Sequence, residues 1–556
     1  MTNMNITAPD YDQTEPAFDS KWGAKYPWIL LLIGIGLSLP IVILYWTHYN
    51  MPLAPEMAPT GFIHSDIPYY IAIARQYSDG VANGLFYPNP YDIALDSPRI
   101  YFQPLFYLWG QILSIAPIDP GLLLTFSTII TTVLAFMLLG HLYFTYALRL
   151  QYNFHFFCLI ILAWGGGALA LLGGGYSLFS GLPLDLFHFD PEKGWWFLNL
   201  GRNFTYPTEA FYHLITILIY FSALTNRRRT LLMLVLLMTI SHPFTGVQYA
   251  LIVFSWMLAE RYIFKQEDIS LWNHLTGLFI VAGTLVYYLW FLPSFDAHRS
   301  LMQQWSLDWH LKIATILGAY GIVALFAFSR CMQANGFKLI LGVPFNRFLL
   351  VCFIVSFALA NHELFIPPKQ PVHFTRGHIW LPLCLLALPA ISRAFFSLRK
   401  KVGKPVGTGL ITVACLLLLS DNISFYYHCY TNHTGLSIQK SHKAALEFIA
   451  GNLNPPPSLI FISNDLYLSF LSATYLPVLP LVGHWPTTPY QHIRLRQAKE
   501  IIKEGKIAPE LVNRSFLFAI TPNNADFPLR SQSRLIMQNQ DLSLFLYPRK
   551  ALTHWP

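Results

Sequence analysis

The residue types that could do acid–base chemistry gather in one polar segment, residues 61–108, of an otherwise apolar chain. Long apolar runs lie on both sides of this segment, so its charges lie next to a membrane. Asp66 is the best candidate for a general base, because partial burial against apolar helices would raise the pKa of its carboxyl toward the working range of a base. The charged and ionisable side chains of the segment are His64, Asp66, Arg75, Asp79, Asp92, Asp96 and Arg99.

Asp66 also has a structural interpretation. It lies two residues before Pro68, and Asp-x-Pro is a good helix start in which the carboxylate caps the first turn. The two roles are compatible, since a loop at an active site also needs a cap. Asp79 with Gly80 is typical of a helix stop and turn.

Three further side chains could bind an anion such as a phosphate. Arg376, in the sequence HFTRGHIW, is the first choice because a guanidinium offers a planar, permanently charged fork for phosphate oxygens. The alternative for Arg376 is an interfacial arginine that contacts lipid headgroups. Arg202 lies in GRNFTYP, and His242 lies between two short apolar runs. His242 could instead satisfy backbone carbonyls freed by Pro243.

Two other segments give weaker signals. Asp190 and Glu192 are candidates for a second acidic group, and the neighbouring Trp195-Trp196 pair is typical of an interfacial aromatic belt. The segment 483–489, GHWPTTP, predicts a turn; it could also help to bind an acceptor.

The composition decides which elements must position these residues. Of 556 residues, 54% are hydrophobic and only 12% are charged, against about 25% for an average soluble domain. This indicates an integral membrane protein with many spans. The net charge of +8 lies in short clusters between apolar runs, which does not favour nucleic acid as a partner. The six cysteines form no disulfide or metal-binding pattern.

The apolar runs predict eleven spans. Residues 104–116 are not counted, because 13 residues are too few for a helix to cross about 30 Å of hydrocarbon. We expect them to form a helix at the interface. The predicted spans are 28–46, 121–146, 153–173, 209–224, 230–241, 245–259, 273–293, 311–329, 348–361, 378–396 and 407–420.

The basic residues between the spans predict the orientation. If the N-terminal tail, residues 1–26, is cytoplasmic, every strong basic cluster falls on the cytoplasmic side, as the positive-inside rule requires. The transmembrane part is then residues 27–422, with a long outer loop over 47–120. Residues 423–556 follow on the outer side. Helical patterns at 442–453 and 491–505, with strand patterns at 458–463, 515–520 and 542–547, predict a small α/β domain there.

Four features of this arrangement resemble the GT-C superfamily of membrane glycosyltransferases. The first is Asp66 followed by Tyr69 and Tyr70, soon after the first span. The second is the start of a half-length helix, QPLFY at 103–107. The third is the triple arginine 227–229 ahead of a short helical hairpin with Ser-His-Pro at its tip, and the fourth is the outer C-terminal domain. The chain differs from many members in having His-Ser-Asp in place of paired acids, and from several in having His242 in place of lysine.

The resemblance implies an all-α polytopic domain of about eleven helices, followed by a small α/β domain. It also implies a transferase function. The enzyme would move a sugar from a polyprenyl-phosphate donor to a hydroxyl of a lipid, glycan or protein acceptor, with inversion, on the outer face of a bacterial inner membrane. Asp66 would be the base, Arg376, Arg202 and His242 would surround the phosphate, and His64, Tyr69 and Tyr70 would contact substrate. No metal ligand set is assigned, and a divalent metal is left open. A membrane transporter and a non-catalytic assembly protein are the alternatives.

Overall fold

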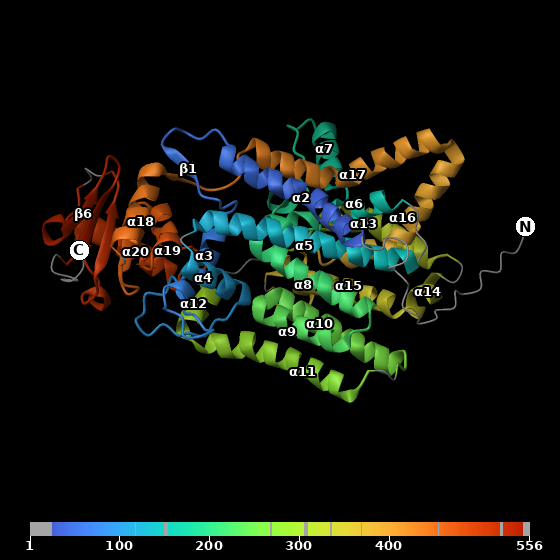
Figure 1. Cartoon of the computed structure of the whole chain (residues 1–556), viewed down its shortest axis with the longest axis horizontal. Coiled ribbons are helices and arrows are strands. Elements are labelled where there is room, and N and C mark those ends of the chain that lie inside the picture. Colours follow the sequence, from blue (N-terminus) through green and yellow to red (C-terminus); the bar gives the residue numbers. More distant parts are fainter. Residues whose placement is uncertain are drawn as a thin grey trace, which may run out of the picture.

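The structure is a computed structural model that describes residues 25–548 except 117, 150–153, 267–268, 305–309, 334–335, 369, 454 and 523–525. Most of the predicted N-terminal tail therefore lies outside the described residues. A bundle of helices forms the larger part, and a small sheet lies at one end of it (Figure 1). The turn between the last two bundle helices, which carries Arg399, Lys400 and Lys401, lies at the other end. The basic turn and the sheet therefore lie at opposite ends of the bundle.

The bundle helices follow the apolar runs of the sequence. Their apolar side chains pack into one large buried cluster, which runs through the bundle and into the sheet region. The helices are α2 (Tyr26–Asn50), α5 (Pro120–Arg149), α6 (His155–Trp164), α7 (Leu169–Phe179), α8 (Pro207–Leu224), α9 (Arg228–Ser241), α10 (Pro243–Leu258), α11 (Leu271–Val286), α13 (Ile313–Cys331), α14 (Gly336–Gly342), α15 (Pro344–Ala360), α16 (Trp380–Val402) and α17 (Lys404–Thr431).

The number of spans differs from the sequence prediction. Among the described residues, six helices are long and apolar enough to cross a membrane, and two bent helix pairs would raise the number to eight. The count of eleven is therefore not confirmed. The runs expected at 209–224, 230–241 and 245–259 do form helices, α8, α9 and α10, but these are 18, 14 and 16 residues long.

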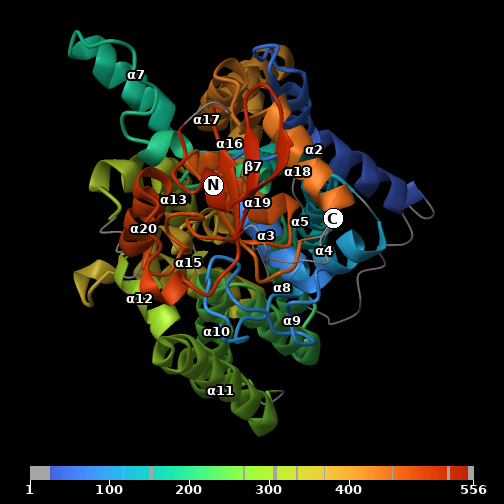
Figure 2. The same cartoon turned by 90° about the vertical axis from the view of Figure 1, so that its left-hand side faces the viewer.

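The predicted span 153–173 is broken. α6 and α7 meet at an angle of 70°, and α7 leaves the bundle (Figure 2). The break falls at the glycines 165–167, which lower the cost of a departure from helical geometry. The freed backbone groups find partners inside the protein, because the Asp421 carboxylate accepts hydrogen bonds from the N–H groups of Leu169 and Ala170 at 3.1 and 2.8 Å.

The outer loop contains two short helices, α3 (Ile67–Ser78) and α4 (Pro104–Ile115). α4 is 12 residues long, in agreement with the expected half-length helix. It begins where Oε1 of Gln103 accepts hydrogen bonds from the N–H groups of Leu105 and Phe106. A further short helix, α12 (Asp296–Gln304), comes after α11 and lies at the same end of the bundle as α3 and α4 (Figure 1).

The C-terminal region forms a five-stranded sheet of order β4-β3-β5-β7-β6. β3 pairs in parallel with β4 and β5, while β7 pairs antiparallel with β5 and β6. Every residue of β3 and β5 is buried, as expected for central strands covered on both faces. The elements are β3 (Ile460–Ser463), β4 (Leu479–Pro480), β5 (Phe516–Ile520), β6 (Arg534–Gln538) and β7 (Ser543–Tyr547), with the helices α18 (Lys440–Asn452), α19 (Leu466–Tyr475) and α20 (Gln491–Glu504).

The sheet region is attached to the outer loop at several points. β1 (Met57–Pro59) pairs antiparallel with β2 (Ser437–Gln439). α19 packs against α3, and the Thr474 hydroxyl donates to the carbonyl of Pro68 at 3.4 Å. Nζ of Lys443 lies 2.9 Å from Oδ2 of Asp119. The segment that carries Asp66 is thus held between the helical bundle and the sheet.

Candidate active site

Asp66 immediately precedes α3, but its side chain makes no capping hydrogen bond to that helix. Instead the carboxylate contacts two histidines. Its Oδ1 lies 3.2 Å from Nε2 of His484, and its Oδ2 lies 3.4 Å from Nδ1 of His64. The Asp66 side chain is 43% exposed. A proton-donating group of a bound molecule can therefore still reach the carboxylate, as a proton acceptor requires.

The pKa of Asp66 differs from the expectation. Burial acts to raise it, as the sequence suggested, but the hydrogen bond with His484 and the nearby charges of His64, His484 and Arg376 outweigh burial and lower the pKa of Asp66 below its usual value. The carboxyl is therefore ionised at neutral pH. Burial lowers the pKa of His64, and the neighbouring Asp66 charge acts in the opposite direction.

His484 comes from the C-terminal region, in the turn that joins β4 to α20. Two backbone hydrogen bonds stabilise the turn: the His484 carbonyl accepts one from the N–H of Thr487 and one from the N–H of Thr488. The imidazole is 7% exposed and lies between two aromatic rings, with centroids 5.1 Å from Phe470 and 6.3 Å from Tyr69. The segment 483–489 is thus a structural turn that also delivers a side chain to Asp66.

Tyr69 and Tyr70, in the first turn of α3, supply aromatic surface beside Asp66. Tyr69 stacks on Tyr91 as well as on His484, with centroids 5.7 Å apart for the tyrosine pair. Tyr70 stacks on Phe106 of α4 with centroids 5.5 Å apart. Tyr70 also lies within electrostatic range of Asp66 and Arg376, so these two groups belong to one neighbourhood.

Arg376 lies between a short 3₁₀ turn, Pro371–Phe374, and α16. Its guanidinium is ion-paired with Glu209, which lies in the first turn of α8 and is buried. Nε of Arg376 is buried and has no hydrogen-bond partner among the described residues. The Arg376 carbonyl lies 2.9 Å from Nε2 of His213. The arginine is therefore held on one side by Glu209, while 17% of its side chain stays exposed.

His242 begins α10 as its cap. Its Nδ1 accepts a hydrogen bond from the N–H of Thr245 at 3.2 Å, and its ring stacks on Tyr212 with centroids 4.6 Å apart. The ring centroid of His373 lies 5.7 Å away, and Phe244 stacks on that second histidine at 4.3 Å. His242 therefore has a helix-capping role, and it lies in an aromatic and imidazole cluster near the Arg376–Glu209 pair.

Arg202 lies in a different environment from the one expected. It is fully buried, with Nη1 2.6 Å from Oδ2 of Asp190, Nη2 donating to the Asp421 carbonyl at 2.6 Å, and Nε donating to Oδ1 of Asn422 at 3.2 Å. Its nitrogens are all used inside the protein. We assign Arg202 and Asp190 to the framework and do not include them among the groups proposed to contact substrate.

A series of aromatic contacts connects Arg202 with the proposed site. The guanidinium lies over the ring of Phe425 at 4.9 Å, and Phe425 lies 5.2 Å from Trp195. Trp195 in turn lies 4.9 Å from His64. Trp195 therefore supports a site histidine, and the buried Trp196 also packs inside the protein, in contrast to the aromatic belt expected for this pair.

The residues do not form a metal site of the usual kind. Within the described ranges, no group of three His, Cys, Asp or Glu side chains is arranged to hold a metal ion. His64 and His484 are directed at different oxygens of one carboxylate.

Comparisons with known proteins found similar solved structures at low sequence identity. No protein-family model and no curated protein sequence matches the chain. The structure is similar to the archaeal oligosaccharyltransferase AglB from Archaeoglobus fulgidus in complex with an inhibitory peptide and a dolichol-phosphate, with a TM-score of 0.47 and 11% identity over 91% of this chain and 70% of that one. It is also similar to ArnT from Cupriavidus metallidurans bound to undecaprenyl phosphate, with a TM-score of 0.42 and 10% identity over 94% of this chain and 98% of that one. At these scores neither match assigns a superfamily or an activity to this chain.

Proposed function

We propose that this protein is an integral membrane glycosyltransferase that moves a sugar from a polyprenyl-phosphate donor to an acceptor hydroxyl. The observation that carries the proposal is the ionised, partly exposed Asp66 carboxylate between His64 and His484, with the Arg376 guanidinium in electrostatic range. A proton acceptor and a cation for a phosphate leaving group are the two requirements of this reaction. The reaction would take place on the outer face of a bacterial inner membrane, with the C-terminal region on the periplasmic side.

The proposed reaction is a single displacement. The acceptor hydroxyl gives its proton to Asp66 while its oxygen forms a bond to the anomeric carbon of the sugar. The bond between that carbon and the phosphate oxygen breaks, and the electron pair leaves with the polyprenyl phosphate. Attack from the side opposite the leaving group inverts the anomeric centre. His64 and His484 would orient the carboxylate so that one lone pair faces the acceptor.

Arg376 would stabilise the departing phosphate. Glu209 holds one arm of its guanidinium, which fixes the plane of the fork before the substrate binds. The remaining donors would then meet phosphate oxygens without a large loss of side-chain freedom. His242 would contact the same phosphate from the cap of α10, and the rings of Tyr69 and Tyr70 would form a wall of the sugar site.

The proposal is tested by the products that depend on Asp66. Glycolipids and glycoproteins are compared between a strain that lacks the gene and strains complemented with the parent protein, with Asp66→Asn and with the control Asp96→Asn. Asp96 is an exposed acid of the same loop. We expect a missing glycan that the parent and the control restore and Asp66→Asn does not. Full restoration by Asp66→Asn would contradict the enzyme and leave a transporter or an assembly protein.

A further inference from the structure

α7 and the segment that follows it project from the helical bundle and carry an apolar tip. Figure 2 shows the molecule along its long axis, and in that view α7 extends sideways, away from the other helices. Every residue from position 178 to position 185 is exposed, among them Leu178 at 76% and Phe179 at 96%. This segment, residues 169–188, is named the α7 hairpin. A contiguous apolar surface outside the bundle marks a place where another molecule covers the protein.

The α7 hairpin is held in one conformation by its own contacts. The Ser177 hydroxyl accepts a hydrogen bond from the N–H of Asp185 at 3.1 Å, and the Ser177 carbonyl accepts one from the N–H of Leu182 at 3.0 Å. The ring of Tyr176 stacks on that of His188, with centroids 4.4 Å apart. The exposed tip therefore has a defined structure of its own.

The backbone of the tip does not depend on water for its hydrogen bonds. Each of residues 180–182 donates its N–H to a carbonyl of α7, and Pro183 has no N–H to donate. In hydrocarbon an unpaired backbone donor is costly, so segments that enter it satisfy these groups internally. Residues 169–184 also contain no charged side chain. The tip is thus suited to an apolar medium.

α17 indicates the depth of the α7 hairpin in the membrane. It begins at Lys404, beside the basic turn at one end of the bundle. Asp421, which accepts hydrogen bonds from the first residues of α7, lies 17 residues after Lys404, which is about 25 Å along a helix. The hydrocarbon of a bilayer is about 30 Å thick. α7 therefore leaves the bundle in the half of the membrane nearer to the sheet region, which is the outer leaflet in the proposed orientation.

The exposed surface of the α7 hairpin continues that of two apolar helices long enough to cross a membrane, α13 and α17. α7 packs against both, and Gly318 of α13 lies against Leu169. Leu317 and Ile423, close in sequence to the residues of these contacts, are exposed. A leaflet binds such a surface through the apolar area that it buries. We infer that the α7 hairpin is inserted in the outer leaflet of the membrane.

The insertion also bears on the proposed site. The chain returns from the α7 hairpin to Asp190, which pairs with Arg202, and then to Trp195, whose ring lies 4.9 Å from His64. The α7 hairpin thus fixes the height of His64 and the neighbouring base relative to the leaflet in which a lipid-linked substrate lies. This consequence rests on the proposed function, whereas the insertion itself does not.

Insertion is tested by the surroundings of a spin label on the full-length protein in vesicles of phosphatidylethanolamine and phosphatidylglycerol. Leu178→Cys or Leu182→Cys is introduced into the Cys331→Ser protein and labelled with a nitroxide, since the other five cysteines are buried. Power saturation then compares relaxation of the label by oxygen, which concentrates in hydrocarbon, with relaxation by a water-soluble nickel chelate. The Cys331→Ser protein alone sets the background of labelling.

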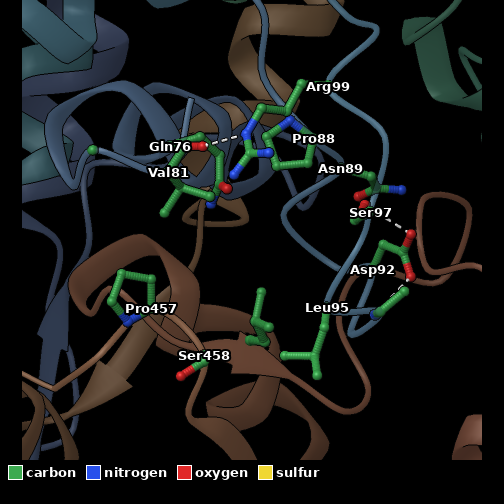
Figure 3. Close-up of a pocket in the computed structure, with 13 residues that line it drawn as sticks. Gln76, Val81, Pro88, Asn89, Asp92, Leu95, Ser97, Arg99, Pro457 and Ser458 are labelled. Carbon is green, nitrogen blue, oxygen red and sulfur yellow. Dashed lines mark hydrogen bonds between the residues drawn. The ribbon is translucent and has the colours of Figure 1, made fainter. Parts of the chain in front are cut away.

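Leu95→Cys is the matched control for the aqueous side. Leu95 has the same exposed fraction as Leu178, 76%, but it lines a cavity between the outer loop and the C-terminal region together with the charged Asp92 and Arg99 (Figure 3). Leu325→Cys, at an exposed position of α13, is the reference for hydrocarbon.

We expect the ratio of oxygen to nickel relaxation at Leu178→Cys and Leu182→Cys to be several-fold higher than at Leu95→Cys and to approach that at Leu325→Cys. A ratio equal to that at Leu95→Cys would place the α7 hairpin in water and overturn the inference. A label that neither reagent reaches would show that a second copy or another protein covers the α7 hairpin, and this would overturn it as well. Because no transfer is measured, the result is independent of the test of Asp66.

Discussion

Nε2 of His484 lies 3.2 Å from Oδ1 of Asp66, so a side chain of the C-terminal region directly contacts the proposed base near the first span. The contact depends on the packing of α19 against α3, because His484 stacks on Phe470 of α19 and on Tyr69 of α3. The sheet region therefore helps to build the site. Asp66 can contact His484 only when the sheet region is docked on the outer loop.

The first prediction concerns Asp66→Asn. A general base contributes typically about 10²- to 10⁴-fold, and we expect a loss of transfer in that range. The unfolding temperature should change little, because the Asp66 side chain caps no helix and Asn is close to Asp in size. Transfer in membranes and thermal unfolding of the purified protein are measured together, with Asp96→Asn as the control. Near-parental transfer would remove Asp66 from the mechanism.

The second prediction concerns the pH dependence of transfer. His484 lowers the pKa of Asp66, so the base stays ionised, and transfer is retained, to a lower pH than an isolated carboxyl would allow. In His484→Gln the pKa of Asp66 should rise, and the acidic limb of the pH profile of kcat/KM should shift to higher pH. His492→Gln changes an exposed histidine of α20 and should leave the profile unchanged. An acidic limb that does not move in His484→Gln would show that the contact does not tune the base.

The sequence predicted the local elements of this structure better than its long-range contacts. The strand patterns at 458–463, 515–520 and 542–547 correspond to β3, β5 and β7 within two residues at either end. Their runs of apolar residues are sufficient because a buried strand is defined by its own side chains. β6 was not predicted, since its burial is only partial and its pattern irregular.

The features that the sequence did not predict have a common physical cause, since each depends on contacts between segments that are distant in the chain. Glu209 and His484 reach the site from distant segments, and no local spacing relates either of them to Arg376 or Asp66. The break between α6 and α7 is stabilised by Asp421 of α17, which a hydropathy pattern over 153–173 does not include. From the sequence alone, Arg202 is a candidate for the phosphate site. Its counter-charge, Asp190, comes from the preceding loop, and only the fold brings the two together.

The third prediction concerns Arg376. Arg376→Lys keeps the charge but cannot hold Glu209 and a phosphate oxygen with one planar fork. One charge-assisted hydrogen bond contributes about 1.5–3 kcal/mol, which corresponds to about ten- to a hundredfold in the use of the donor. The measurement is the KM for the polyprenyl-phosphate donor. Arg299→Lys, an exposed arginine of α12, is the control. An unchanged donor KM in Arg376→Lys would leave Arg376 only its structural pair with Glu209.

The fourth prediction concerns orientation in the membrane. A single cysteine introduced at Arg228 or Lys400 should be labelled only from the cytoplasmic side, and one introduced in the exposed part of α20 at His492 only from the outside. Each cysteine is introduced into a protein in which Cys331 is replaced by serine. Cys331 is half-buried, and the other five cysteines are buried. Labelling at Arg228 from the outside would reverse the orientation of the hairpin α9–α10 and with it the side assigned to Asp66.

The last prediction separates the framework from the site. Arg202 and Asp190 form a fully buried ion pair, and removal of one partner of such a pair typically costs about 3–5 kcal/mol, because the other charge is left unpaired. Arg202→Met should therefore lower the unfolding temperature strongly. The double variant Arg202→Met, Asp190→Leu should recover much of that loss, because it leaves no unpaired charge. If Arg202 is framework only, the recovered protein should bind the donor with a KM close to that of the parent. A stable double variant whose donor KM is raised tenfold or more would contradict this assignment and return Arg202 to the phosphate site, where its charge could not be replaced by packing.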